Sequence, residues 1–515
     1  MAKNNILESR EVAELAQLVE ESTRSNREGV KYFLEPALGV LARAKSKRHH
    51  IIFGRRGSGK SSLLRKTESD LSAKRIPVVV VDLEGFKGHS YPDVLLSVLI
   101  KTFAEYKKWL ETAAIYPASK SSFWQRFGQV PLIKPLKQDV TGQVIKSLEE
   151  SLLELNRLLN APEEVDKTDT TENAASGSIK GLVGVKTVAE ASLETAASLS
   201  STDKSQSSYK SKKIEALHRN IIKYKDIVSR ICDMGEGSAY LLLDDLYHIR
   251  IADQPEVIDY FHRIAKDTGL WLKVGTIKHR SRWYVAGNPP VGMKIADDAD
   301  AIDLDITLEK YDLTKRFLLK ILEQFAQEKK LNLNEILTDG AKDRLVLASG
   351  GVARDFLTIF RRGIEVASAR IASAGPSAGA KIIAEDINIA AGEHDSNKRE
   401  EFNRDTTPED QQDLTDFLND ISDFCLKQND ANCILVDKEI KGKEERLVGE
   451  LVDLKFLHHV KSRVTVRGQS RKIYDAYMLD VSQYTGQRKR QNFEMIKFWG
   501  PDSADALRKT KLIFR

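Results

Sequence analysis

Residues 50–64 read HIIFGRRGSGKSSLL, and the expected fold class of the chain follows from them. The apolar run 50–53 predicts a short strand, and the residues from Ser61 onward predict the start of a helix. Between them, residues 54–61 fit the spacing GxxxxGK[ST], a loop that binds phosphate through its backbone N–H groups. We therefore predict a phosphate-binding loop with a strand before it and a helix after it, which is the context that this motif requires.

Each residue type in this loop has a chemical task. Gly57 and Gly59 let the backbone approach phosphate oxygens, and the positive end of the following helix dipole adds to the attraction. Lys60 supplies charge to the β and γ phosphates, and the hydroxyl of Ser61 is a ligand for Mg²⁺. We therefore expect ATP and Mg²⁺ as cofactors; the competing interpretation is a glycine-rich turn that fits by chance. The predicted nucleotide-binding residues are Gly54, Gly57, Ser58, Gly59, Lys60, Ser61 and Ser62.

Two acidic residues follow another buried strand. Residues 239–243 are apolar and lead into Asp244 and Asp245. A nucleotide hydrolase needs a carboxylate here to hold the metal ion and its water shell, so we expect Asp244 to bind Mg²⁺ together with Ser61. Asp245 is expected to orient the attacking water or to accept its proton. The competing interpretation is that both aspartates cap the helix that follows.

Apolar strands and helical patterns alternate along the first 310 residues. This alternation is typical of an α/β protein with a doubly wound parallel sheet, here of the P-loop NTPase type. The expected strands are 50–53, 78–81, 239–243, 271–275 and 302–306, with helices at 91–111, 213–232 and 255–266.

One segment between the second and third of these strands has a different composition. Residues 167–211 contain 25 Ala, Ser, Thr or Gly among 45 residues. Such a chain buries too little apolar surface to offset the entropy that ordering would cost. We expect residues 161–212 to form a flexible insertion.

The chain divides into a core and two smaller parts. The predicted core is 1–310, including a helical lead-in at its N-terminus. Apolar residues at helical spacing predict a small α-helical domain at 311–395. The polar run 396–410 is expected to be a linker. Residues 411–515 read as helix, strand, helix and hairpin, an order that resembles a winged-helix module.

Basic charge is concentrated near the C-terminus. Residues 455–515 contain 14 Lys and Arg against 5 Asp and Glu, whereas the whole chain has an excess of only +5. Such a cluster on a hairpin suits contact with the phosphates of duplex DNA. The alternative is that the module packs on the core and relays its state, with the basic residues as a solvated face. The predicted DNA contacts are Lys461, Arg463, Arg467, Arg471 and Lys472.

Together the motifs resemble the AAA+ and STAND group of P-loop ATPases, and within it the origin-recognition-like branch. The resemblance covers about residues 30–395. The Asp-Asp ending at 244–245 is closer to STAND enzymes than to the Asp-Glu ending usual in AAA+ proteins. This departure and the insertion leave oligomer geometry and turnover rate open.

The resemblance assigns roles to further residues. It implies that the helical domain is a lid whose Arg354, in the stretch GGVARDFL, reaches the γ phosphate. It implies that Thr276 is the polar sensor 1 residue, bonded to water or to the γ phosphate. Asp245, Thr276 and Arg354 are therefore the expected catalytic residues. The basic residues at 278–282 are candidates for a contact across a homo-oligomer.

Composition sets the expected location. The 515 residues include no apolar run of the length that a membrane span requires. Acidic and basic residues at positions 8, 10 and 11 stand where a signal peptide needs its apolar core. The three cysteines show no metal-binding spacing. We expect a cytoplasmic protein with no membrane partner.

These observations favour an Mg²⁺-dependent ATPase that acts as a DNA-associated oligomeric motor or switch, and slow, switch-like hydrolysis is compatible with them. The alternative is a nucleotide-gated signalling or scaffold ATPase whose winged helix binds a partner effector protein, for example in prokaryotic defence or transposition. No second catalytic motif is present in the sequence, so that alternative implies a separate effector or recombinase subunit. A small-molecule kinase is disfavoured because it needs neither the lid arginine nor a third domain.

Overall fold

The computed structural model describes most of the chain. The predicted insertion at 161–212 falls almost wholly outside the described residues, as does the predicted DNA contact Arg471. Within the described part, no helix combines the length and the apolar character needed to cross a bilayer. The described ranges are 6–23, 28–115, 138–161, 212–374, 379–405, 408–469, 472–485, 495–500 and 503–514.

A parallel five-stranded sheet forms the centre of the core. Its strand order is β2-β3-β4-β1-β7, which is typical of P-loop NTPases and confirms the predicted α/β fold. Strand β1 lies between β4 and β7, so the loop after β1 sits close to the carboxyl ends of both. The strands are β1 (His50–Phe53), β2 (Val78–Asp82), β3 (Ala239–Asp244), β4 (Leu270–Thr276) and β7 (Asp300–Asp303).

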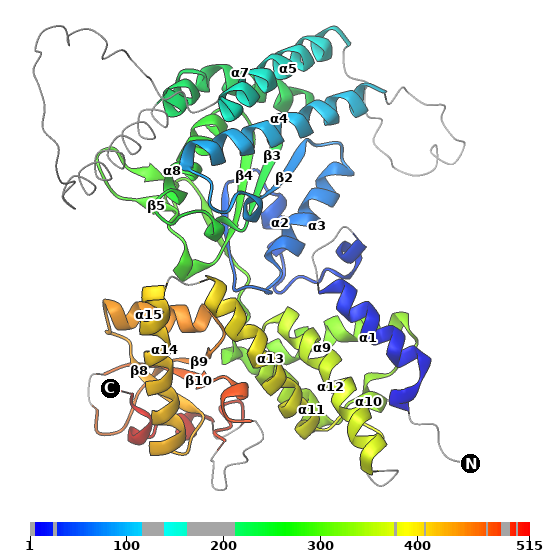
Figure 1. Ribbon diagram of the computed structural model, residues 1–515, viewed down its shortest axis with the longest axis vertical. Helices are drawn as coiled ribbons and strands as arrows, with labels where there is room; N and C mark the ends of the chain where they lie inside the picture. Colours follow the sequence, from blue (N-terminus) through cyan, green and yellow to red (C-terminus); the bar gives the residue numbers. More distant parts are fainter. Residues whose placement is uncertain are drawn as a thin grey trace, which may run out of the picture.

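Helices cover both faces of this sheet (Figure 1). Side chains alternate along β3, so that Leu241 and Leu243 pack under one layer of helices while Tyr240 and Leu242 pack under the other. The first layer contains α4 (Tyr91–Ile115), α5 (Gln138–Asn160), α7 (Ile221–Met234) and α8 (Gln254–Ala265), and the second contains α2 (Val40–Lys45) and α3 (Lys60–Ser72). A small β-ribbon is formed by β5 (Tyr284–Val285) and β6 (Val291–Gly292).

A helical domain follows the sheet and includes the N-terminal helix. Helix α1 (Arg10–Ser22) buries Val12, Leu15 and Val19 in the same hydrophobic core as Leu318 of α9. The predicted lead-in to the core therefore packs on the lid, because these three residues form one apolar face. The domain contains α9 (Tyr311–Glu328), α10 (Leu333–Ile336), α11 (Asp339–Ser349), α12 (Ala353–Ala374) and α13 (Ala384–Asp405).

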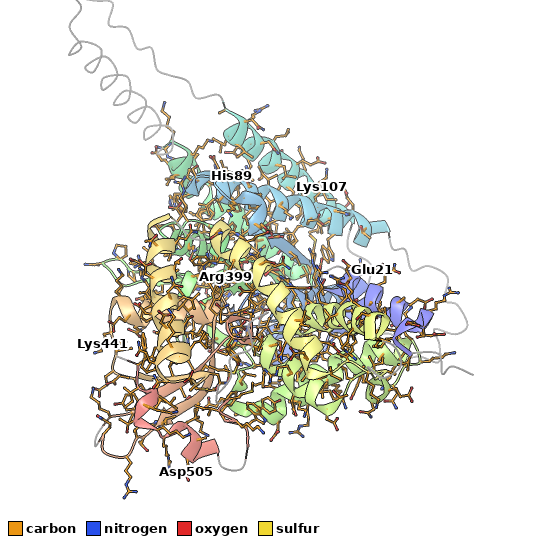
Figure 2. The ribbon with its side chains drawn as sticks, turned by 60° about the horizontal axis from the view of Figure 1, so that its bottom comes forward. Glu21, His89, Lys107, Arg399, Lys441 and Asp505 are labelled. Atoms are coloured by element: carbon orange, nitrogen blue, oxygen red, sulfur yellow. The ribbon has the colours of Figure 1, made fainter. Side chains whose placement is uncertain are left out.

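The predicted linker at 396–410 is wrong over most of its length. Helix α13 continues through it to Asp405, and α14 (Pro408–Asp423) begins three residues later. Two polar residues near the start of this stretch are paired with the C-terminal domain. Lys398 is buried against Asp480 at 2.9 Å, and Arg399, labelled in Figure 2, donates to Gln483 at 2.9 Å. The rest of the division into domains stays a prediction.

The C-terminal domain has the expected order of helix, strand, helix and two strands. Its antiparallel sheet has the order β8-β10-β9. Val460, Val464 and Met478 of this sheet share one hydrophobic core with Phe356 and Phe360 of the lid. Lid and C-terminal domain are therefore packed as one unit. The elements are α14, β8 (Cys433–Asp437), α15 (Lys443–Asp453), β9 (Leu457–Val464), β10 (Tyr474–Leu479) and the short α16 (Ser503–Leu507).

Helix α15 also contacts the core. The carboxylate of Asp453 accepts a hydrogen bond from the backbone N–H of His279 at 3.1 Å, just beyond the end of β4. A Cβ on Gly449 would lie 2.9 Å from the His279 ring, so α15 approaches this loop closely at a glycine. Burial, and then the nearby Asp305, raise the pKa of Asp453 to about 7.

This carboxyl predicts a pH dependence of stability. The folded protein keeps a proton on Asp453 up to about pH 7, whereas the unfolded chain releases it near pH 4, the ordinary value for aspartate. The free energy of unfolding should therefore fall as pH rises between these values and then level off. Asp453→Asn removes the titrating group, so its free energy of unfolding should lack this contribution to the fall. The stability of the variant relative to the parent should therefore increase as pH rises from about 4 to about 7. Denaturant titrations from pH 4.5 to 8, with exposed Asp420→Asn as control, measure it; parallel curves for parent and Asp453→Asn would contradict it.

Candidate nucleotide-binding site

The phosphate loop has the backbone that its glycines allow. Gly57 and Gly59 adopt φ angles of +88° and +100°, in the left-handed region that other residues rarely enter. A Cβ on Gly57 would lie 2.7 Å from Cβ of Arg354, so the loop touches the lid at this residue. The hydroxyl oxygen of Ser58 is buried and makes no hydrogen bond to any described residue. A phosphate oxygen in this loop would supply the missing partner.

Lys60 is the first residue of α3 and lies inside the loop. Its side chain is 4% exposed, and its Nζ donates to the carbonyl oxygens of Gly54 at 3.0 Å and Arg55 at 3.4 Å. Burial lowers the pKa of Lys60, and the charges of Asp245 and Asp244 oppose that shift. Anionic phosphate would likewise stabilise the charged amine.

The acidic pair lies next to the serine that follows this lysine. Ser61 is hydrogen-bonded to Asp244, the last residue of β3, and Asp245 Oδ1 lies 4.0 Å from Lys60 Nζ. Burial and the neighbouring Asp245 raise the pKa of Asp244 to about 6. The structure thus brings together the two predicted Mg²⁺ ligands, a hydroxyl and a carboxylate, which are oxygen donors of the kind that this ion prefers.

Asp245 has an unusual backbone. Its φ is +55°, and its N–H donates to Asp244 Oδ1 at 3.0 Å. This turn directs the chain away from the strand at the point where the second carboxylate faces the cavity. No side-chain cap bond joins Asp245 to the short helix after it, contrary to the capping interpretation.

Thr276 is placed between the loop and the acidic pair, because β4 lies between β1 and β3. Its carbonyl oxygen accepts from the N–H of Gly54 at 3.2 Å. Its hydroxyl is fully buried and shares a short hydrogen bond with Ser281. The position agrees with the predicted sensor 1, whereas the hydroxyl is engaged by its own loop. The role therefore stays a prediction.

Arg354 reaches the loop from the lid. It lies in the first turn of α12, and its backbone N–H donates to the carbonyl oxygen of Gly57 at 3.2 Å. Its side chain lines the same cavity as Lys60 and Asp245. Residues 300 positions apart in sequence thus meet at one site.

The cavity joins these polar groups to an apolar end. Its volume is about 220 Å³. Tyr32 and Phe325 lie at the apolar end with ring centroids 4.5 Å apart, alongside Phe33, Phe317 and Ile321. Phosphates at the loop and a flat base between aromatic and aliphatic side chains would fit this division. The predicted residues that line it are Gly57, Ser58, Gly59, Lys60, Ser61, Ser62, Asp245 and Arg354.

Sequence reasoning missed Arg55. Its side chain is 3% exposed; Nε donates to Asp305 at 3.2 Å, and Nη2 donates to the carbonyl oxygens of Ile306 at 3.2 Å and Gly350 at 3.1 Å. Its own N–H also bonds to Asp305, at 2.9 Å. Arg55 occupies a variable position of the motif, so the motif does not predict this role. The residues that accept hydrogen bonds from its side chain lie about 250 to 295 positions away in sequence.

The predicted DNA contacts lie on the C-terminal hairpin. Lys461, Arg463 and Arg467 are exposed on β9 and the turn after it. None of the three forms an ion pair with a described residue. Lys472 is also exposed, but its Nζ lies 2.7 Å from Asp437. Strand β9 is also held to the segment that leads from the sheet into α9, because Ser462 N–H donates to Glu309 at 2.9 Å.

Comparison with known proteins adds a likeness to solved structures. No protein-family model and no curated protein matches the chain. Among solved structures, the Aeropyrum pernix Orc1 protein in complex with DNA matches at 14% sequence identity and a TM-score of 0.33. The match covers 92% of this chain and 89% of that chain. The strand order and the phosphate loop define the P-loop fold independently of this likeness.

The first prediction from this geometry concerns Lys60. Lys60→Ala should weaken ATP binding by roughly tenfold to a hundredfold or more, because a charge-assisted hydrogen bond contributes about 1.5–3 kcal/mol. Calorimetry with ATP and Mg²⁺ measures the affinity. Lys66→Ala, on the same helix but outside the cavity lining, is the matched control. Equal affinities for parent and Lys60→Ala would exclude the cavity as the ATP site.

The second prediction separates the two aspartates. Asp245→Asn should keep nucleotide affinity and slow hydrolysis, because the amide retains the shape but cannot accept the water's proton. Asp244→Ala should also raise the Mg²⁺ concentration needed for binding, because it removes a carboxylate beside Ser61. Single-turnover hydrolysis and Mg²⁺ titrations compare them. Parental rates in both variants would show that the pair is misassigned.

Proposed function

We propose that this protein is an Mg²⁺-dependent ATPase of the AAA+/STAND type. The observation that carries the proposal is the convergence of Lys60, Ser61, Asp245 and Arg354 on one cavity with an apolar end, with Asp244 next to Ser61. A phosphate loop alone would suit any nucleotide-binding protein. A second carboxylate that faces the loop suits hydrolysis, and a lid arginine beside the loop suits detection of the γ phosphate.

The residues divide the work as follows. The loop N–H groups and Lys60 bind the phosphates, and Asp245 orients the attacking water and accepts its proton. Ser61 and Asp244 would hold Mg²⁺, which supplies charge neutralisation between phosphate oxygens when it is bound. Arg354 distinguishes nucleotides that have a γ phosphate from those that lack one. The turn at Asp245 and the hydrogen bond between Thr276 and Gly54 hold the carboxylate and the phosphate loop in position relative to each other.

We further propose that the ATPase acts on duplex DNA as an oligomeric motor or switch. Lys461, Arg463 and Arg467 form an exposed basic strip on β9 and its turn. Because Val460 and Val464 of β9 pack in the same hydrophobic core as Phe356 of α12, a phosphate backbone bound by this strip would bear on the helix that carries Arg354. The proposed homo-oligomer follows from the family resemblance.

A second candidate is a nucleotide-gated scaffold whose C-terminal domain binds an effector or recombinase protein. A groove of about 850 Å³ between α14, α15 and β8 favours it. Its floor includes Phe417, Leu447 and Phe514, and its rim includes exposed Asp416 and Glu444. Acidic rims repel DNA phosphates, whereas a groove with an apolar floor suits a polypeptide.

One experiment separates the two candidates. The ATPase rate is measured with and without duplex DNA, together with the oligomeric mass in ATP and in ADP. Stimulation by duplex and assembly in ATP support the DNA-associated ATPase. A rate indifferent to duplex, in a protein that retains a stoichiometric protein partner, supports the scaffold. Absence of hydrolysis in both conditions would contradict the proposed enzyme.

The basic strip gives a quantitative prediction. If Lys461, Arg463 and Arg467 neutralise phosphates, reversing all three to Glu should reduce the slope of log affinity against log salt by about 2.7, at about 0.9 per contact. The loss should be nearly uniform across duplexes of unrelated sequence, because phosphate contacts do not read bases.

The matched control reverses three exposed lysines elsewhere, Lys101 and Lys108 of α4 and Lys320 of α9. Fluorescence anisotropy of labelled duplexes at several salt concentrations gives the slopes. A slope that changes equally in both triple variants would mean that net charge, and not the strip, determines binding. An unchanged slope in the strip variant would exclude β9 as the DNA contact.

A further inference from the structure

Two consecutive residues of α12 face different parts of the molecule. Arg354 lines the nucleotide cavity, whereas Asp355 is buried and contacts the C-terminal domain. Consecutive positions are about 100° apart around an α-helix, so one turn presents both side chains to different neighbours. Any shift of this turn moves both of them together.

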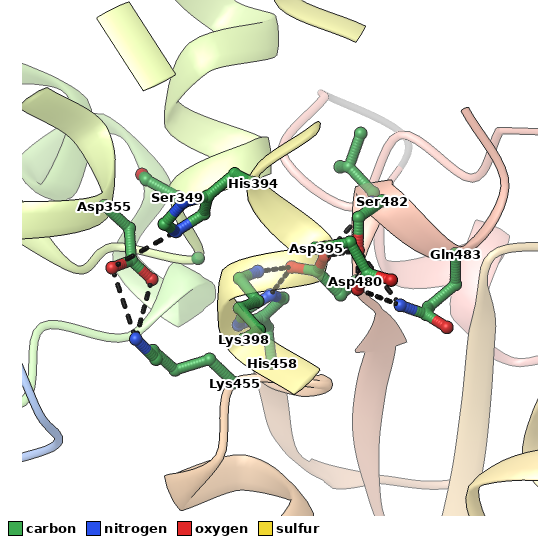
Figure 3. A network of polar contacts seen from close by, with 12 residues as sticks. Ser349, Asp355, His394, Asp395, Lys398, Lys455, His458, Asp480, Ser482 and Gln483 are labelled. Atoms are coloured by element: carbon green, nitrogen blue, oxygen red, sulfur yellow. Dashed lines mark hydrogen bonds and ion pairs between the residues drawn. The ribbon is translucent and has the colours of Figure 1, made fainter. Parts of the chain in front are cut away.

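The partner of Asp355 is Lys455, the second residue after α15 ends at Asp453 (Figure 3). Lys455 Nζ lies 3.2 Å from Oδ1 and 3.1 Å from Oδ2 of the carboxylate. The two residues are 4% and 2% exposed. Burial alone would raise the pKa of Asp355, but Lys455 and His394 beside it hold that pKa well below its usual range. The carboxylate is therefore charged in the interior and depends on its cationic partner.

The backbone of Lys455 is shaped for this contact. Its φ is +67°, a region that residues other than glycine and asparagine seldom occupy. A glycine would adopt this turn without strain, yet a lysine is found, with its charged end inside the lid. An outlier of this kind is worth a functional hypothesis when its side chain has a specific partner.

A second contact fixes the same region. Gly350 precedes α12, and a Cβ there would lie 2.0 Å from the ring of His458 in β9. His458 is bonded to Asp480 at 2.6 Å, and Lys398 of α13 completes the set at 2.9 Å. Figure 3 shows this cluster beside the Asp355–Lys455 pair. The C-terminal domain thus contacts both Gly350, just before α12, and Asp355 in the first turn of α12.

We infer that Lys455 is a positioning residue for Arg354. It is not among the residues that line the nucleotide cavity, and it acts by anchoring Asp355 so that the first turn of α12 presents the guanidinium to the γ phosphate. The inference rests on the proposed function, in which Arg354 distinguishes ATP from ADP. It makes that distinction depend on a residue of the C-terminal domain, about 100 positions away in sequence.

The test compares affinities for ADP and for the slowly hydrolysed analogue ATPγS, both with Mg²⁺, by calorimetry on the full chain. Arg354→Ala should lower the preference for ATPγS by roughly tenfold or more, the worth of one charge-assisted hydrogen bond. Lys455→Met keeps the length of the side chain and removes its charge. It should lower the preference by a similar factor, and adding Arg354→Ala to it should cause little further loss.

Two further variants separate positioning from general damage. Lys455→Arg keeps the charge and should restore most of the preference, while Lys441→Met, exposed in the same domain, should leave it at the parental value. If Lys455→Met does not fold, Asp355→Asn/Lys455→Met removes both buried charges and should fold, while still losing the preference.

The outcomes are distinct. A parental ATPγS preference in the folded double variant, or equal losses for ADP and ATPγS that add to those of Arg354→Ala, would overturn the positioning role and leave the proposed ATPase intact. No effect of Arg354→Ala on the preference would overturn the sensor assignment and this inference with it. Loss of both ligands in Lys60→Ala shows independently that the cavity binds nucleotide.

Discussion

The nucleotide site depends on the hydrogen bonds that join Arg55 of the phosphate loop to the chain between the sheet and the lid. The guanidinium lies inside the protein and has three acceptors, the carboxylate of Asp305 and the carbonyl oxygens of Ile306 and Gly350. Asp305 and Ile306 lie just after the last strand of the sheet, and Gly350 lies just before α12. One side chain of the phosphate loop therefore bonds both to the segment that leads into the lid and to the loop between α11 and α12. Gly57 of the same loop lies against Arg354, so the phosphate-binding loop and the proposed sensor arginine are in direct contact.

Charge burial recurs at the junction of the lid and the C-terminal domain. Asp355 and Asp480 are nearly inaccessible, and each is paired with a buried lysine. Such pairs add little net stability compared with apolar side chains, because desolvation offsets most of their attraction. Their geometric requirement is strict, however. The two pairs join α12 and α13 to the C-terminal domain at defined positions.

The parts that could be predicted from sequence are those encoded by local patterns. Patterns of a few residues are enough to predict the strand before Gly54, the loop glycines and the aspartates after β3. The parallel sheet follows from the alternation of apolar strands and helices along the chain. The linker at 396–410 was wrong because its polar composition, including the run 403–408, is that of an exposed segment, whereas the partners of Lys398 and Arg399 lie some 80 positions later in the chain. Arg55 and Lys455 were invisible for the same reason. Basic residues next to a turn are commonplace, and their burial depends on distant segments.

The hydrophobic core shared by lid and C-terminal domain has a consequence for dissecting the molecule. Val460, Val464 and Met478 point from the small sheet into apolar side chains that belong to α9, α11 and α12. A fragment beginning at Pro408 would turn this face of the sheet toward water, next to a lysine whose carboxylate partner had been left behind. The natural unit for cutting the chain is therefore the lid and the small sheet together. A fragment of the sheet alone would present a sticky surface that could be mistaken for affinity toward another protein.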